Sequence, residues 1–171
     1  INNIALVKGR PQLLNLRDLI ELFIEHRHDV VYRRTQFELR KAEERVHILE
    51  GLIIAVDNID EVIRIIRAAS EPQEAIEKLM ERFSLSLIQA RAIVDMRLRA
   101  LTGLEREKLK EEYAALMQEI ERLKALLADK ELRAQLIREE LLEIKEKYGD
   151  ERRSEIIYTA EEFNPEDFYA D

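Results

Sequence analysis

The amino-acid sequence predicts an all-α protein. We expect a long antiparallel two-helix coiled-coil arm with a small helical globular knob at its tip and a short β-hairpin at the N-terminus. Charged residues make up 37% of the chain and aromatic residues 6%, with only four glycines and three prolines, which is typical of a helical, coiled-coil-rich protein. Two stretches also carry apolar residues at helical spacing on either side of a compact middle segment. Helices of this kind cannot bury their apolar stripes alone, so we expect them to pair.

Residues 1–14 are predicted to form a β-hairpin left over from an upstream domain. Residues 4–7 (Ile-Ala-Leu-Val) are strand-like, residues 8–11 (Lys-Gly-Arg-Pro) indicate a turn, and residues 12–14 lead out of it. Because the sequence begins with Ile1 and not with Met, we expect the chain to be a fragment of a longer protein.

Residues 15–57 are predicted to form the ascending arm helix. Asn15 is a favourable N-cap, and Asp18 places a carboxylate beside the free amides of the first turn. At a rise of 1.5 Å per residue, such a helix is roughly 60 Å long. Its apolar residues recur at helical spacing and comprise Leu16, Leu19, Ile20, Phe23, Val30, Phe37, Ala42, Val46, Leu49, Ile53 and Val56.

Residues 58–103 are predicted to form the knob, because they contain four helix starts. Asn58 or Asp57, Ser70, Ser86 and Thr102 are capping residues that predict helices over 59–69, 75–83 and 87–98 and the start of the return arm. The knob is rich in apolar residues for its size, which favours a symmetric contact between two copies. The alternative is a knob that packs only on itself and on the end of the arm. We expect the dimer contact at Ile88, Ala92, Met96, Leu98, Leu101 and Leu104.

Residues 104–149 are predicted to form the return arm, which carries an a/d seam. An interruption is expected at Ala128-Asp129, and Gly149 is suited to end the helix. Residues 150–171 are expected to form an exit loop, a short strand near Ile156 and an acidic linker. The seam residues are Leu109, Tyr113, Leu116, Ile120, Leu123 and Leu127, followed by Ile137, Leu141, Ile144 and Tyr148.

The net charge of −8 is concentrated at the end of the chain. Residues 150–171 hold eight acidic and two basic side chains, which accounts for six of the eight excess negative charges. The net charge of the whole chain therefore says little about whether the base of the arm faces DNA. A basic patch on the first arm helix would suit a phosphate backbone, but the sequence alone favours a solvated flank whose arginines pair with glutamates of the opposite arm. The patch comprises Arg27, Arg33, Arg34, Arg40 and Lys41.

We find no catalytic, cofactor-binding or metal-binding constellation in the sequence. His26, His28 and His47 have no metal-ligand spacing. Tyr32, which precedes Arg33 and Arg34, is the only tyrosine outside the seam and the tail, and we expect no catalytic role for it. The absence of cysteine fits a reducing cytoplasm, and no apolar run is long enough to cross a membrane.

Over residues 1–157 the sequence closely resembles the arm of the DNA gyrase A subunit family, which belongs to the bacterial type IIA topoisomerases. The corresponding protein of topoisomerase IV shares this plan, but residues 37–42 and 101–105 look more gyrase-like. Tyr32 departs from the pattern, since a smaller residue is expected there. The resemblance rests on Glu25-His26-Arg27, Arg33-Arg34-Thr35, Phe37-Glu38-Leu39-Arg40-Lys41-Ala42, His47-Ile48-Leu49-Glu50-Gly51-Leu52, Leu79-Met80-Glu81-Arg82-Phe83, Asp95-Met96-Arg97-Leu98, Leu101-Thr102-Gly103-Leu104-Glu105 and Tyr148-Gly149-Asp150-Glu151-Arg152-Arg153.

The resemblance implies a part of an ATP-dependent topoisomerase that passes one DNA duplex through a double-strand break in another and changes supercoiling. It implies a cytoplasmic enzyme with magnesium, a catalytic tyrosine upstream of Ile1, and ATP hydrolysis on the gyrase B subunit as partner. None of those sites would lie in this chain, which would not be active alone. It would be the coiled-coil region and exit gate, forming a homodimer through the knob, with the basic patch lining a DNA-sized cavity.

Two other interpretations of the sequence remain open. The first is a topoisomerase IV arm, and the second is a non-catalytic coiled-coil dimerisation scaffold. A nucleic-acid-binding arm like that of seryl-tRNA synthetase fits poorly, because its tip should be tight and basic. This tip is apolar and balanced in charge.

Overall fold

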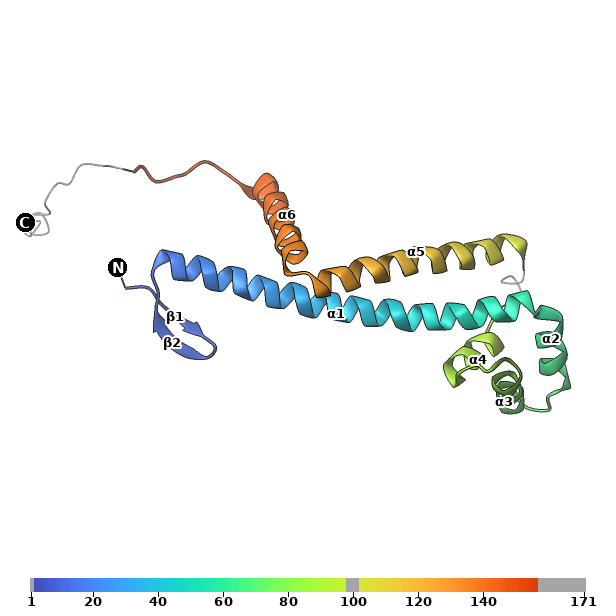
Figure 1. The fold of residues 1–171 in the computed structure, drawn as a ribbon. Coiled ribbons are helices and arrows are strands. Elements are labelled where there is room, and N and C mark those ends of the chain that lie inside the picture. The colour runs from blue at the N-terminus through green and yellow to red at the C-terminus, as the bar shows by residue number, and fades with distance from the viewer. Residues whose placement is uncertain (1, 98–101, 157–171) are drawn as a thin grey trace, which may run out of the picture. The chain divides into compact units, whose positions relative to one another are not determined.

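The computed structural model describes residues 2–97 and 102–156 (Figure 1). It confirms a mostly helical protein with an N-terminal hairpin, and it divides into two compact units, Ile1–Arg138 and Glu139–Asp171. The first unit contains the hairpin, the long helix α1, the knob helices α2 to α4, helix α5 and the start of α6. The second unit contains the rest of α6, followed by residues 149–156 in neither helix nor strand.

The N-terminal hairpin pairs β1 (Ile4–Val7) with β2 (Arg10–Leu13) in antiparallel fashion, with Ile4 opposite Leu13. Lys8 and Gly9 connect the strands with φ angles of 50° and 79°. Two consecutive left-handed residues form the tight turn that best matches the twist of a hairpin, and glycine adopts this conformation without steric cost. The turn is thus shorter than predicted, and residues 10 and 11 belong to β2.

Helix α1 (Leu16–Asp57) is a single unbroken helix of 42 residues, as predicted. It begins with a complete capping box. The Asp18 amide donates to Asn15 Oδ1 at 2.9 Å, and the Asn15 amide donates to Asp18 Oδ2 at 3.2 Å. These bonds satisfy two of the amides that the first turn of a helix leaves without partners.

The buried stripe of α1 differs from the predicted one in its first half. Val31 and Thr35 are buried, whereas Val30 is half-buried and Phe37 is 53% exposed. Thr35 tolerates burial because its hydroxyl donates to the Val31 carbonyl oxygen at 2.8 Å, so no polar group is left unsatisfied. Hydropathy alone selects Phe37 over threonine, which explains the error. Further along, the predicted Ala42, Val46 and Leu49 are buried.

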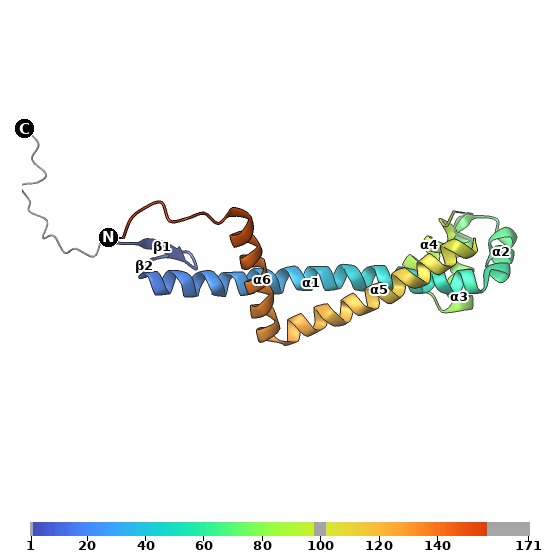
Figure 2. The same ribbon diagram turned by 90° about the horizontal axis from the view of Figure 1, so that it is seen from above.

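Helix α5 (Gly103–Ala128) runs antiparallel to the second half of α1, and the two lie side by side in both ribbon views (Figures 1 and 2). Ile120 packs against Ala42 and Val46 in the seam. Polar pairs across the seam agree with this register. Arg45 bonds Glu112 at 2.7 and 3.0 Å, and Arg106 bonds Asp57 at 3.1 Å.

The predicted interruption of the return arm is confirmed between α5 and α6 (Lys130–Tyr148). Asp129 Oδ1 accepts a hydrogen bond from the Glu131 amide at 2.8 Å, which caps the new helix. Arg133 donates to the carbonyl oxygens of Leu126 and Leu127 at 2.7 and 2.8 Å, where α5 has run out of helical partners. Free backbone groups at both helix ends of the break therefore have side-chain partners. Asp129 accepts from an amide at the start of α6, and Arg133 donates to carbonyl oxygens at the end of α5.

The predicted seam is only partly correct on the return arm. Ile120, Leu123 and Ile137 are buried, but Leu126 is more buried than the predicted Leu127. Ile144 and Tyr148, predicted to continue the seam, are largely exposed. A heptad count cannot be carried across Asp129, because the break resets the direction and phase of the helix.

The knob contains α2 (Ile59–Ala68), α3 (Pro72–Phe83) and α4 (Leu87–Val94). Helix α4 ends four residues before the predicted boundary. The N-cap of α3 is Glu71 and not Ser70, whose amide instead donates to Glu74 at 2.8 Å. Residues 150–156 contain no strand, so the strand predicted near Ile156 is not found in the described part of the tail; Ile157 lies outside it.

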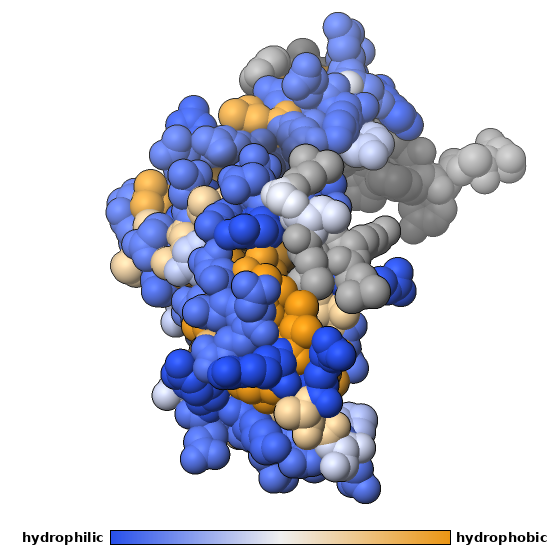
Figure 3. All heavy atoms as spheres, turned by 90° about the vertical axis from the view of Figure 1, so that its right-hand side faces the viewer, coloured by the Kyte–Doolittle hydropathy of each residue, from blue (hydrophilic) through white to orange (hydrophobic). Residues whose placement is uncertain are grey.

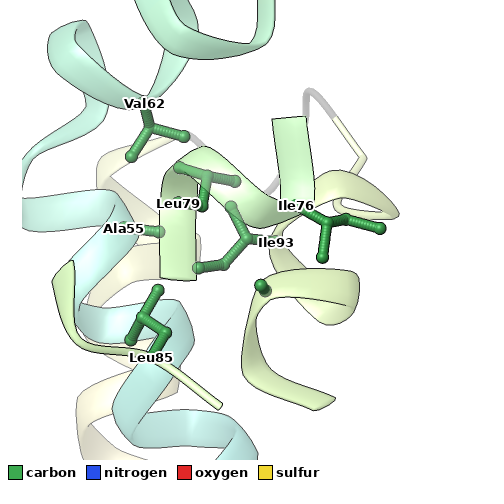
Figure 4. Packing of buried hydrophobic residues seen from close by; sticks show 7 residues of the cluster. Ala55, Val62, Ile76, Leu79, Leu85 and Ile93 are labelled. Atoms are coloured by element: carbon green, nitrogen blue, oxygen red, sulfur yellow. The ribbon is translucent and has the colours of Figure 1, made fainter. Parts of the chain in front are cut away.

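The knob has its own hydrophobic core, which also receives one residue of α1. Leu79 and Ile93 lie at its centre and are almost fully buried, and Ala55 enters from the arm helix (Figure 4). Val62, Ile76, Leu85 and Ala90 complete the buried cluster. The core therefore ties the knob to the last turns of α1.

The Arg45–Glu112 pair is expected to contribute little to the free energy of unfolding. The hydrogen bond from Arg45 to Glu112 raises the pKa of Arg45, but both side chains are more than two-fifths exposed. Solvent screening limits such a pair, so a double-mutant cycle with Arg45→Ala and Glu112→Ala should give a coupling of about 0.2–1 kcal/mol. Urea unfolding of the four proteins measures it. A coupling well above this range would show that the pair is shielded from water.

Candidate functional site

The knob carries an apolar hollow on its outer side, which we call the tip hollow. It has a volume of about 360 Å³ and lies between α2 and the end of α4. Figure 3, which looks onto the end of the arm, shows a hydrophobic area with hydrophilic side chains along part of its border. Such an area is more typical of a contact with another molecule than of a surface that faces water permanently. The hollow is lined by Ile59, Val62, Ile63, Ile66, Arg67, Ile93, Val94 and Met96.

The residues predicted for the dimer contact are placed unequally by the structure. Ile88 is 60% exposed on α4, Ala92 is half-buried, and Met96 is half-buried at the edge of the tip hollow. Leu98 and Leu101 lie outside the described residues, and of Leu104 only the backbone, within α5, is described. The structure thus brings one predicted residue, Met96, to the hollow and leaves Ile88 available on the surface.

The isoleucines of α2 were not predicted to belong to the dimer contact, although they form much of the tip hollow. Ile59, Ile63 and Ile66 recur at spacings of four and three, so they lie along one side of that short helix. This spacing is a usable signal. It could not be separated from ordinary core packing in the sequence, because Val62 on the same helix is buried in the knob core.

A second arrangement, which we call the tip joint, connects α1 to α4 through His47, Gly51, Ser86 and Gln89. Gln89 is buried, and its amide nitrogen donates to the His47 carbonyl oxygen at 2.7 Å. Its amide oxygen accepts from the Ser86 amide at 3.0 Å, as the predicted capping box requires. His47 Nε2 also lies 2.7 Å from the Ser86 hydroxyl oxygen.

The predicted basic patch lies on α1, but part of its charge is neutralised within the same helix. Arg33 pairs with Asp29 at 2.8 Å, and Lys41 pairs with Glu44 at 2.9 Å. Arg33 thus pairs within its own helix and not with a glutamate of the opposite arm, which was the alternative prediction for the arginines. The Lys41 hydrogen bond lowers the pKa of Glu44.

The other members of the patch have different surroundings. Arg34 lies 4.0 Å from Glu38 on its own helix, and the Arg40 guanidinium lies 5.5 Å from the centre of the Phe37 ring. Arg27 is half-buried. Arg40 and the exposed Phe37 ring next to it together offer a cation and an apolar face.

Tyr32, which precedes Arg33 and Arg34 in the sequence, is 38% exposed and contacts an arginine from the return arm. The Arg133 guanidinium lies 5.4 Å from the centre of its ring, while the same arginine donates to carbonyl oxygens at the end of α5. Tyr32 therefore packs against Arg133 next to the break in the return arm.

The described residues offer no metal centre and no membrane helix. Across residues 2–97 and 102–156, no group of three or more His, Cys, Asp or Glu side chains is arranged to hold a metal ion. Within the same residues, every helix is too short or too polar to cross a membrane.

Comparison with known proteins gives consistent matches along the chain. The family model for the A subunits of DNA gyrase and topoisomerase IV matches residues 1–142. A DNA gyrase A subunit from Halalkalibacterium halodurans is 54% identical over 167 residues, which is 98% of this chain and 20% of that protein. A DNA gyrase A subunit from Staphylococcus aureus (strain MRSA252) is 54% identical over 156 residues, 91% of this chain and 18% of that protein. The chain thus spans about a fifth of the length of these relatives.

Proposed function

The chain belongs to the family formed by the A subunits of DNA gyrase and topoisomerase IV, and on that premise we propose that it is the coiled-coil arm and exit-gate region of a DNA gyrase A subunit. In this role it holds two copies of the protein together at the tips of their arms and opens to release a transported DNA duplex. The knob is the contact, and the paired helices α1 and α5 are the arms that carry it.

The observation that carries this proposal is the tip hollow. Its lining continues the knob core to the surface, because it includes two core residues, Val62 and Ile93, and three residues that pack against the core, Ile59, Ile66 and Val94. Ile63 lines the same hollow and is 39% exposed, so apolar surface remains there that the knob core does not cover. Apolar surface at the end of a long arm favours contact with another molecule, and a symmetric contact between identical copies is the commonest kind in soluble proteins. A gate must also open, which suits a contact of moderate area better than a large obligate interface.

The basic patch supports the part of the proposal that concerns DNA. Arg27, Arg33, Arg34, Arg40 and Lys41 lie within one stretch of α1 that precedes the knob along the chain. A surface of this kind attracts a phosphate backbone without reading its sequence. Its partial neutralisation by Asp29 and Glu44 suits a duplex that must pass and leave.

The chemistry of the complete enzyme lies elsewhere in this proposal. A tyrosine outside this chain would cut and reseal DNA with the help of magnesium, and the gyrase B subunit would hydrolyse ATP in the cytoplasm. This chain contributes the closing and opening of the exit, and it needs no cofactor for that.

Light scattering across a concentration series tests the proposal. We expect a dimer with twice the 20.2 kDa mass of the chain. Ile63→Glu or Ile88→Glu should dissociate it, since each introduces a charge on the proposed contact. Ile20→Glu is the matched control, because Ile20 is exposed on α1 far along the chain from the knob, and this variant should remain dimeric. A strict monomer, or a dimer that both knob variants leave intact, would refute the proposed contact.

A further inference from the structure

We propose that the tip joint, with Gln89 as its positioning residue and Gly51 as its contact point, locks the knob onto the end of α1 so that helix and knob move as one rigid lever. This inference rests on the proposed gate function. It adds that α1 and the knob do not move relative to each other when the gate opens. Opening would then occur away from the junction between α1 and the knob.

The first support is the close approach of α4 to the backbone of α1 at Gly51. A Cβ atom at this position would lie 2.7 Å from Gln89 Cβ and 2.8 Å from Gln89 Cγ, both far inside contact distance. These are the first atoms of the Gln89 side chain, and rotation of that side chain cannot move its Cβ away. Glycine in a helix interior costs about 1 kcal/mol relative to alanine. Here it allows α4 to lie directly against α1.

The second support is the way in which Gln89 is held. It is only 6% exposed, and its side-chain amide is used in both directions. The nitrogen donates to the His47 carbonyl oxygen of α1, and the oxygen accepts from the Ser86 amide at the start of α4. A buried amide that loses such partners carries the full cost of its desolvation, so the knob cannot tilt on α1 without breaking directional bonds.

The third support is that the joint and the seam use different sides of α1. His47, Gly51 and Ala55 are spaced by four residues and lie along one side of the helix, with Ala55 packed into the knob core. The seam with α5 uses Ala42, Val46 and neighbouring residues instead. The attachment of the knob therefore does not depend on the attachment of α5, and it extends over two turns of α1.

Distances between two spin labels on one chain test this inference directly. The sequence contains no cysteine, so single cysteines can be placed at exposed Glu43 on α1 and Glu81 on α3 without competing sites. A second pair, Glu43 and Lys124, reports the spacing of the two arms. Labelled chains are diluted with unlabelled ones, so that only distances within one chain are measured, whether or not the chain dimerises.

We expect a narrow distance distribution between arm and knob in the unchanged protein. Gln89→Met keeps the volume but removes the bonds, and Gly51→Ala forces the helices apart, so both should broaden and shift this distribution. The distance between the arms should not change. Matched controls are Gln73→Met, at an exposed glutamine of α3, and Gly103→Ala, where an added Cβ meets no atom within 4 Å. Both should give the native distribution.

Two results would overturn the inference. One is a native arm-to-knob distribution in both Gln89→Met and Gly51→Ala, with helical content retained. The other is a broad distribution in the unchanged protein, which would place a hinge at the junction. A strict monomer in light scattering would instead refute the gate contact and leave the measurement of the joint valid.

Discussion

Leu79→Ala is expected to lower the free energy of unfolding by about 2–5 kcal/mol, the range typical of a fully buried leucine replaced by alanine. Leu79 has no exposed surface and lies at the centre of the knob core with Ile93 and Ala55 (Figure 4). The loss combines the transfer of apolar atoms with the cavity left behind. Urea unfolding followed by circular dichroism measures the change.

Ile88→Ala is the informative control for Leu79→Ala, since both remove an aliphatic side chain from the knob. Ile88 is largely exposed in the single chain, so its loss should change the free energy of unfolding of the monomer by less than about 0.5 kcal/mol. It should still weaken the proposed dimer. A destabilisation of the monomer as large as that of Leu79→Ala would mean that α4 turns Ile88 toward the knob core.

Ile120→Ala is expected to cost about 2–5 kcal/mol for a different reason, because it opens the seam between the two arms. Ile120 is 3% exposed and packs against Ala42 and Val46 of α1. Ala42 is small, so neighbouring side chains have little volume with which to fill the gap. Thermal unfolding should show the loss as a lower melting temperature.

Met117→Ala is the matched change on the outer side of α5, where the side chain is exposed. It should leave the melting temperature nearly unchanged, since alanine is also the stronger helix former. Equal melting temperatures for Ile120→Ala and the unchanged protein would show that the arms pair in another register.

Features that depend on neighbouring residues were predictable from the sequence. The capping box of Asn15 and Asp18 and the break at Asp129 both follow from hydrogen bonds that span two or three residues. The seam residues Val46 on α1 and Ile120 on α5 were predicted for a similar reason, because each belongs to an apolar repeat along its own helix. On α1 the prediction failed where a side chain satisfied its polar atoms locally, as Thr35 does with the Val31 carbonyl. On the return arm it failed beyond the break, where Ile144 and Tyr148 are exposed.

The site was less predictable, because it depends on which helix faces are covered after folding. Ile63 and Val62 are adjacent and similarly apolar, yet only the packing of the knob core decides that Val62 is buried and Ile63 remains partly exposed. The tip joint was missed for a related reason. Gly51 and Gln89 are far apart in the sequence, and the only local signal was a glycine within a long helix.

The uninterrupted length of α1 converts small angles into large displacements. A helix of 42 residues measures about 63 Å, so a tilt of about 10° at its first turn carries its last turn about 11 Å sideways. In the proposed dimer, two symmetric arms that tilt in opposite directions would move their tips apart by twice that displacement. If the tip joint holds the knob at a constant angle to α1, the knob moves by the full displacement of the helix end. The fine control of the aperture would then reside in the few residues around Asn15, at the opposite end of the helix.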